Sequence, residues 1–104
     1  MKMWIDDVRP APDDTYIEVY SVNVAKLLII KNENGTFRPN DIIELIDIDH
    51  DAGEFAHNGG DYIKLLDWLE ETGRNYPIRI HSMNPVGREN MRRIIERNGW
   101  KEIH

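Results

Sequence analysis

Residues 41–51 decide the predicted fold; they read Asp41-Ile42-Ile43-Glu44-Leu45-Ile46-Asp47-Ile48-Asp49-His50-Asp51. The apolar part of this stretch is typical of a buried strand, so we predict a strand over Asp41–Ile48. Three ionisable residues follow it directly. A buried strand that is followed by ionisable residues ends at the edge of its sheet. We therefore expect the side chains of Asp49, His50 and Asp51 at the carboxyl edge of the sheet.

Strand and helix patterns alternate on both sides of this segment. Further strands are predicted over Lys2–Ile5, Thr15–Tyr20, Pro77–His81 and Trp100–Ile103, and helices over Val22–Asn32, Asp61–Glu71 and Gly87–Asn98. The segment Asp6–Asp14 is predicted as a loop because Pro10 and Pro12 interrupt regular structure. The alternation predicts a flavodoxin-like α/β sandwich of three layers around a mostly parallel, five-stranded sheet. The orientation of the strand Thr15–Tyr20, parallel or antiparallel, stays open.

Length and composition favour one small domain over residues 1–104. The chain has no cysteine, which excludes disulfides and thiolate metal sites and suits a cytoplasmic protein. The acids at Asp6 and Asp7 come too early for a signal peptide, and no stretch approaches the ~20 apolar residues of a membrane span. The net charge of −6 disfavours binding to long duplex nucleic acid through its phosphates. We therefore expect no membrane and no long duplex among its partners.

Carboxylates follow two of the predicted strands. Asp6 and Asp7 come directly after the first strand, and Asp49 comes directly after the third. Because the carboxyl ends of parallel strands share one edge of a sheet, these side chains are expected to meet in a ligand-binding crevice. Oxygen ligands of this kind suit Mg²⁺, which also shares phosphate oxygens. The alternative is that Asp7 caps a turn and Asp6 is solvated.

Two histidines lie at the same predicted edge, and both are candidates for proton transfer. His50 follows the third strand and His81 ends the fourth. A histidine titrates near pH ~6.5 and can exchange protons at neutral pH. Asp49 is a candidate nucleophile, although an activated water would suffice.

A phosphate-binding segment is predicted where the last helix begins. Ser82 and Asn84 precede this helix, Gly87 opens it, and Arg88 follows. Free N–H groups and the positive end of the helix dipole favour phosphate at such a position, and an arginine adds a bidentate grip. The alternative is a plain turn with Arg88 solvated.

Three segments carry a resemblance to a known family. They are Trp4-Ile5-Asp6-Asp7-Val8-Arg9-Pro10-Ala11-Pro12, Asp49-His50-Asp51-Ala52-Gly53, and His81-Ser82-Met83-Asn84-Pro85-Val86-Gly87-Arg88-Glu89-Asn90-Met91. In this order they resemble the cyclic-phosphate processing receiver domain, a relative of response-regulator receivers. The resemblance implies a receiver-like sheet and a role in recognising or processing 2′,3′-cyclic phosphate ends of RNA or cyclic nucleotides.

The resemblance also assigns roles to individual residues. It matches Asp6 and Asp7 to the acidic metal-binding pair of receivers, Asp49 to the aspartate that receivers phosphorylate, and Ser82 to their switch hydroxyl. The chain departs from receivers because the first helix is replaced by the proline-rich loop and the last helix is missing. The Lys-Pro pair after the last strand is missing too, which argues against a phosphorelay role.

Two classes of function follow from these residues. One is a Mg²⁺-dependent phosphodiesterase that opens a cyclic phosphate, with Asp49, His50 and His81 as catalytic candidates. The other is a module without turnover, either a sensor of cyclic nucleotides or phosphate or a receiver-like signalling and interaction domain. An uncovered sheet face would leave room for a homodimer.

Overall fold

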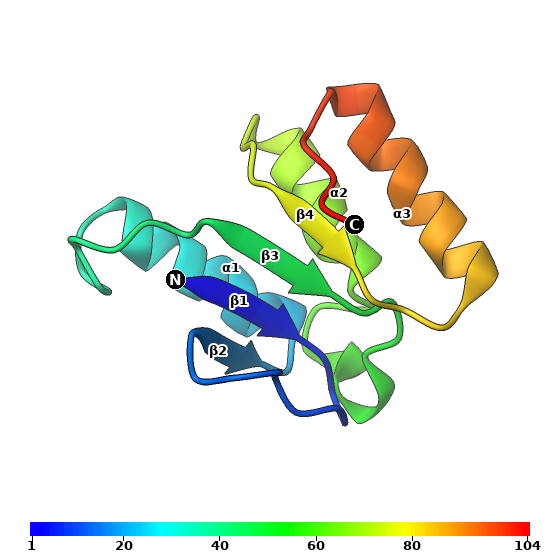
Figure 1. Cartoon of the computed structure of the whole chain (residues 1–104), viewed down its shortest axis with the longest axis horizontal. Helices are drawn as coiled ribbons and strands as arrows, with labels where there is room; N and C mark the ends of the chain where they lie inside the picture. Colours follow the sequence, from blue (N-terminus) through cyan, green and yellow to red (C-terminus); the bar gives the residue numbers. More distant parts are fainter.

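Four parallel strands form the sheet that positions the rest of the chain (Figure 1). The computed structural model describes residues 1–104. Its strands are β1 (Lys2–Ile5), β2 (Tyr16–Val19), β3 (Leu45–Ile48) and β4 (Ile78–Ile80), in the spatial order β2-β1-β3-β4. β2 runs parallel to β1, which answers the question that the sequence left open. The predicted parallel α/β fold is confirmed.

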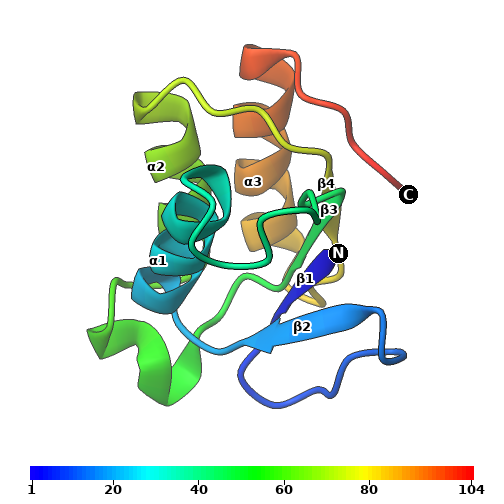
Figure 2. The same cartoon turned by 90° about the vertical axis from the view of Figure 1, so that its left-hand side faces the viewer.

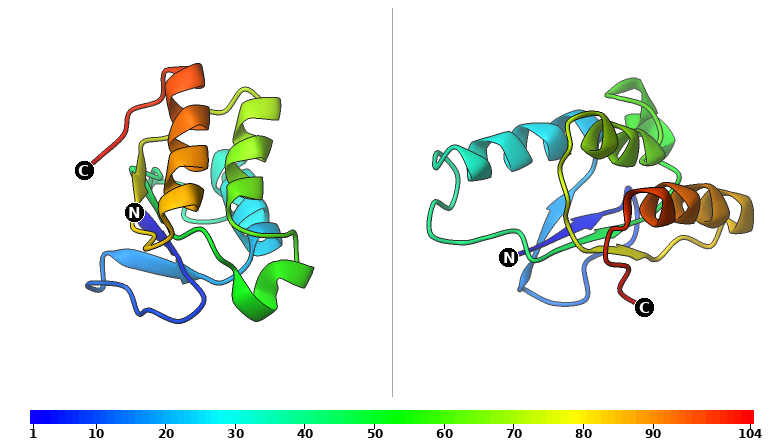
Figure 3. Two further views of the ribbon diagram at one scale, coloured as in Figure 1. Left: turned by 90° about the vertical axis from the view of Figure 1, so that its right-hand side faces the viewer. Right: turned by 90° about the horizontal axis from the view of Figure 1, so that it is seen from above.

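All three helices lie on one side of this sheet, so the domain has two layers (Figures 2 and 3). They are α1 (Val22–Glu33), α2 (Ile63–Glu71) and α3 (Pro85–Asn98), and a short 3₁₀ helix, η1 (Gly53–His57), precedes α2. The expected three-layer sandwich is wrong. In the strand order β2-β1-β3-β4, the connection from β2 to β3 and the connection from β3 to β4 both run toward the β4 edge of the sheet. Because crossovers between parallel strands are right-handed, connections that run in the same direction place their helices on the same face.

The expected fifth strand is reduced to one bridge. Residues 100–103 were predicted to form it, but only Glu102 pairs, in parallel with Ile78. The backbone N–H of Ile78 donates to the carbonyl of Lys101, and that of Ile103 donates to the carbonyl of Ile78. β4 has only three residues and meets this segment at its first one, so no ladder develops.

The apolar core fills the space between the sheet and the helices. Alternate strand residues enter it, including Met3 and Ile5 of β1 and Ile46 and Ile48 of β3. Each helix contributes a buried stripe, and the helix residues of the core are Val22, Ala25, Ile29, Leu65, Leu66, Leu69, Met91, Ile94 and Ile95. This burial fixes the sheet register, because a shift by one residue would turn every core side chain outward. None of the helices has the length and apolar composition needed to cross a membrane.

The opposite side of the sheet, which we call the outward face, carries no helix (Figure 3). Trp4, Asp47 and Arg79 lie on it, since they alternate with core residues in paired strands. The loop between β1 and β2 covers part of this face, and the Trp4 indole Nε1 donates to the carbonyl of Arg9 at 2.8 Å. A loop and a polar network therefore stand where a second layer of helices would pack.

The helix boundaries follow local capping chemistry. α3 begins at Pro85, two residues before the predicted start at Gly87. Asn84 is its N-cap, with a side-chain oxygen that accepts from the Gly87 N–H. Proline suits the first helical position because the N–H that it lacks has no partner there. The pair Asn84-Pro85 is thus the start of the helix.

Candidate functional site

The carboxyl ends of β1 and β3 bring three aspartates together. One carboxylate oxygen from each of Asp6, Asp7 and Asp49 lies within 4.8 Å of the others. We call these three residues the acidic cluster. Asp6 and Asp49 are buried, whereas Asp7 is half-buried. The predicted candidates for metal binding therefore share one edge of the sheet.

Asp6 is the most heavily hydrogen-bonded member of the acidic cluster. Its Oδ1 accepts from the backbone N–H groups of Val8 and Arg9, and its Oδ2 lies 3.0 Å from Arg9 Nε and 2.9 Å from His81 Nε2. Burial raises the pKa of Asp6, but these hydrogen bonds and the charge of Arg9 outweigh burial and hold the pKa below its ordinary value. Asp6 is therefore ionised in the folded protein at neutral pH.

Asp7 shows the opposite behaviour. Burial raises its pKa, its own backbone N–H opposes this effect, and the charges of Asp6, Asp49 and Asp51 raise the pKa further. The net shift is upward, so ionised Asp7 is electrostatically unfavourable in the free protein. Nearby cationic charge would relieve this repulsion. The acidic cluster thus fits a hard divalent cation by donor type, spacing and charge.

Arg9 lies across the acidic cluster and was missed as a site residue. Its Nε is 3.0 Å from Asp6, and its Nη2 is 3.2 Å from Asp49. The sequence places Arg9 next to the acidic pair, but its contact with Asp49 depends on the pairing of β1 with β3. Arg9 partly neutralises two buried carboxylates that would otherwise repel each other.

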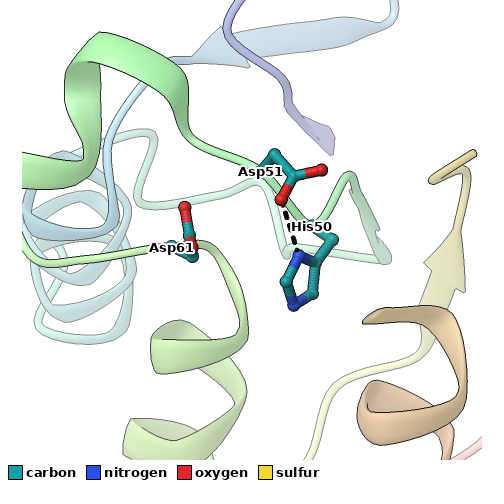
Figure 4. A group of neighbouring side chains, drawn as sticks. All are labelled: His50, Asp51 and Asp61. Carbon is teal, nitrogen blue, oxygen red and sulfur yellow. Dashed lines mark hydrogen bonds and ion pairs between the residues drawn. The ribbon is translucent and has the colours of Figure 1, made fainter. Parts of the chain in front are cut away.

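His50 follows Asp49 directly after β3, and Figure 4 shows its side chain with those of Asp51 and Asp61. Its Nδ1 is 3.0 Å from Asp51 Oδ1, and the same group of possible ligands includes Asp61, which was not predicted as a site residue. Asp61 accepts from the backbone N–H of Ala52 and so holds the loop after β3. The second nitrogen of His50, Nε2, makes no hydrogen bond within the protein.

The imidazole of His50 packs on Gly87, in the first turn of α3. A Cβ added at Gly87 would lie 2.5 Å from Cγ of His50. This close approach requires glycine and brings the end of β3 against the start of α3. The segments predicted to supply a base and a phosphate site therefore meet in space.

His81 is placed differently from His50. Its Nδ1 lies 2.7 Å from Asp47 Oδ1, its Nε2 lies 2.9 Å from Asp6, and its side chain is 7% exposed. Both ring nitrogens are therefore occupied by carboxylates. Asp47 is fully buried and also contacts Arg79 and the hydroxyl of Tyr16. Asp47 was not predicted as a site residue, because it lies within the apolar run of the predicted strand Asp41–Ile48.

The remaining predicted residues lie in the loop that leads into α3 and in the first turn of that helix. Ser82 is buried, and its hydroxyl accepts from the N–H of Asn84. The side-chain oxygen of Asn84 accepts from Gly87. These bonds shape the turn and cap the helix. Arg88 is exposed and has no acidic partner within the chain.

Comparison with protein families matches residues 1–97 to the cyclic-phosphate processing receiver domain. The match includes every segment that contributes to the site, from Asp6 to Arg88. No match is found among the curated proteins or the solved structures.

Proposed function

The chain belongs to the cyclic-phosphate processing receiver domain family, which suggests a role in cyclic-phosphate processing, and from this premise we propose a specific activity. The carboxyl edge of the sheet binds a 2′,3′-cyclic phosphate, on an RNA end or a nucleotide, together with a divalent cation. The protein then opens the cyclic phosphate by hydrolysis.

The position of His50 carries this proposal. The ring packs on Gly87 at the start of α3, and Asp51 orients its Nδ1. The backbone N–H of His50 donates to Asp49 of the acidic cluster. A hydrogen bond from Nδ1–H to Asp51 leaves the Nε2 lone pair free to accept a proton. His50 is a better candidate for the base than His81, whose two nitrogens both face carboxylates.

In the proposed reaction, the oxygen of a water molecule bonds to phosphorus while the bond from phosphorus to one ribose oxygen breaks. Nε2 of His50 takes one proton from the water and returns it to the leaving ribose oxygen. The products are a phosphate monoester and a free ribose hydroxyl. Since one water is added and nothing is oxidised or reduced, no further reactant is needed.

The other residues bind and orient the phosphate. Asp7 and Asp49 would hold the cation with Asp6 beside them, and the cation would offset the charge that develops on phosphorus. Arg88 is exposed without an acidic partner, so its guanidinium is free to grip a phosphate oxygen. Ser82 and Asn84 would support this grip by fixing the turn before α3.

Phosphorus NMR of 2′,3′-cyclic nucleotides incubated with protein and Mg²⁺ tests the proposal. We expect a new monoester resonance from the wild type, and its rate of formation should fall by ~100-fold or more in His50→Gln. Asp49→Asn should reduce the rate similarly. Asp14→Asn is the matched control, because it removes the same charge from an exposed loop at the opposite edge of the sheet.

The spectra separate the alternatives. Broadened but intact cyclic resonances would make the protein a binding module without turnover. Cyclic resonances that stay sharp and intact for all four bases would reject the proposed function. A wild-type rate that persists in both His50→Gln and Asp49→Asn would show that another site carries the activity.

A further inference from the structure

Arg9 is the only arginine or lysine that contacts the acidic cluster. Its guanidinium lies 3.0 Å from Oδ2 of Asp6 and 3.2 Å from Oδ2 of Asp49. The carboxylates are almost inaccessible, with side chains 0% and 10% exposed, whereas the Arg9 side chain is 41% exposed. The arginine therefore covers the acidic cluster from its solvent side.

The backbone of Arg9 is fixed, but its side chain is not enclosed. Its N–H donates to Oδ1 of Asp6, and its carbonyl accepts from the Trp4 indole. Pro10 follows and restricts the backbone further. The guanidinium can consequently leave the carboxylates by rotation about side-chain bonds, while the loop and the sheet stay in place.

A divalent cation would compete with Arg9 for the same carboxylates. Arg9 contacts the Oδ2 oxygens of both Asp6 and Asp49, and one oxygen from each aspartate of the cluster is close enough to share an ion. Three carboxylates and one guanidinium leave an excess of negative charge, which attracts a second cation. Once that cation neutralises the carboxylates, the guanidinium loses most of its attraction to them.

We propose that Arg9 is an internal counter-ion, which a divalent cation displaces from Asp6 and Asp49 and which then binds the phosphate of the ligand. The second half of this inference rests on the proposed function. The planar guanidinium fork matches two phosphate oxygens, and a short rotation keeps it beside the ion. Arg9 would thus hold the acidic cluster together in the free state and position the ligand in the bound state.

Arg79 supplies a matched control. Its Nη1 lies 3.1 Å from Oδ2 of the buried Asp47, and its side chain is also 41% exposed. It lies on the outward face and contacts no member of the acidic cluster. Arg79→Gln therefore removes a guanidinium as exposed as that of Arg9 from Asp47, a carboxylate as buried as that of Asp6, on the outward face.

The test measures two affinities in the same variants. Calorimetry gives the affinity for Mn²⁺, and calorimetry at saturating Mn²⁺ gives the affinity for 2′,3′-cyclic AMP, with His50→Gln present throughout to prevent turnover. We expect Arg9→Gln to bind Mn²⁺ about tenfold more tightly and 2′,3′-cyclic AMP about tenfold more weakly. Arg9→Lys should recover part of the nucleotide affinity. Arg79→Gln should match the parent in both measurements.

Opposite shifts in the two affinities distinguish this role from a structural one. A merely structural arginine would weaken both when removed, and that result overturns the inference. If Arg9→Gln binds Mn²⁺ no more tightly than the parent, or if neither binds it, the counter-ion role is wrong. If Arg9→Gln binds Mn²⁺ more tightly but binds the cyclic nucleotide as well as the parent does, the proposed contact between Arg9 and the phosphate is wrong. A parent that binds Mn²⁺ but no cyclic nucleotide contradicts the proposed function, and its Mn²⁺ data still decide the counter-ion role.

Discussion

The imidazole of His81 stacks on the indole of Trp4, with ring centroids 3.9 Å apart and planes 2° apart. This stacking fixes the position of the imidazole, so that its Nδ1 contacts Asp47 and its Nε2 contacts Asp6. Trp4 is itself buried beneath the loop between β1 and β2. His81 therefore links the outward face of the sheet to the acidic cluster.

Replacing His81 by alanine should destabilise the fold. The substitution takes a hydrogen-bonding partner from two fully buried carboxylates, Asp47 and Asp6. Leaving buried acceptors without this hydrogen-bonding partner costs about 3 kcal/mol. Urea unfolding should show a loss of this order, and Asp47→Asn in the same chain should recover part of it. If Asp47→Asn instead lowers the stability of the His81→Ala variant further, the loss is not caused by leaving Asp47 without its partner.

Gly87→Ala should separate folding from function. Alanine is a better helix former than glycine by about 1 kcal/mol, although Gly87 is a buried position of α3. Its Cβ would nevertheless lie 2.5 Å from Cγ of His50 and push the imidazole away from its place. We expect a folded protein by circular dichroism with turnover of 2′,3′-cyclic nucleotides reduced by at least ~10-fold. Val86→Ala, in the same turn, should keep wild-type turnover.

Asp7→Asn should stabilise the protein when no divalent cation is present. The pKa of Asp7 is raised by burial and by neighbouring carboxylates, so its ionised form opposes folding at neutral pH. Thermal unfolding in EDTA should give a higher Tm for the variant than for the wild type, whereas the rise in Tm on adding Mg²⁺ should be smaller. Asp14→Asn should change neither value. A lower Tm in EDTA would show that Asp7 does not repel its neighbours.

Glu33 should make stability depend on acid pH. Hydrogen bonds from Arg74 hold the pKa of Glu33 below its ordinary value of 4.5, burial opposes them, and a hydrogen bond from Tyr76 lowers it further. A depressed carboxyl pKa stabilises the fold above the ordinary value and loses this effect as pH falls through the folded value. Glu33→Gln should therefore unfold more easily than the wild type at pH 7, and the difference should shrink below pH 4.5 and vanish once the pH is below the folded pKa.

The control for Glu33 is Glu71→Gln, a change at an exposed carboxylate with no ion-pair partner. Urea unfolding of both variants and the wild type across pH 3–7 is the measurement. A Glu33→Gln difference that stays constant over this range would mean that the contact with Arg74 does not shift the pKa of Glu33.

The repeating pattern of strands and helices could be predicted well from the sequence. Short apolar or β-branched runs predicted the four strands, and two of them, β1 and β3, end directly before an aspartate. The helical spacing of Leu65, Leu66 and Leu69 predicts the buried side of α2, which the structure confirms. The same signals placed Asp6, Asp7 and Asp49 at one edge, which is where the structure has them. These features are local in sequence or follow from the parallel pairing of strands, so the periodicity of the sequence is enough to predict them.

The buried side of α1 was predicted wrongly. The spacing of Val24, Leu27 and Leu28 in the sequence predicts that they form one inward face, but Val24 and Leu27 are 46% and 50% exposed. Val22, Ala25 and Ile29 are buried instead. The helix is apolar nearly all round, so its periodicity does not distinguish one face from another.

Arg9 and Asp47 could not be assigned from local patterns. The contact of Arg9 with Asp49 spans 40 residues and exists only because β1 pairs with β3. One feature of the sequence did indicate a role for Asp47, because a charged residue within a buried apolar run requires a buried hydrogen-bonding or ionic partner. The sequence did not identify that partner, because His81 and Arg79 reach Asp47 through the pairing of β3 with β4.

The outward face also has a thermodynamic consequence. Unfolding exposes the polar groups of Asp47, Arg79 and His81 there, where a second layer of helices would expose apolar side chains. Apolar exposure raises the heat capacity of unfolding, whereas polar exposure lowers it. The heat-capacity increment should therefore be smaller than for a domain of this length with both faces covered, giving a flatter stability curve that loses little on cooling.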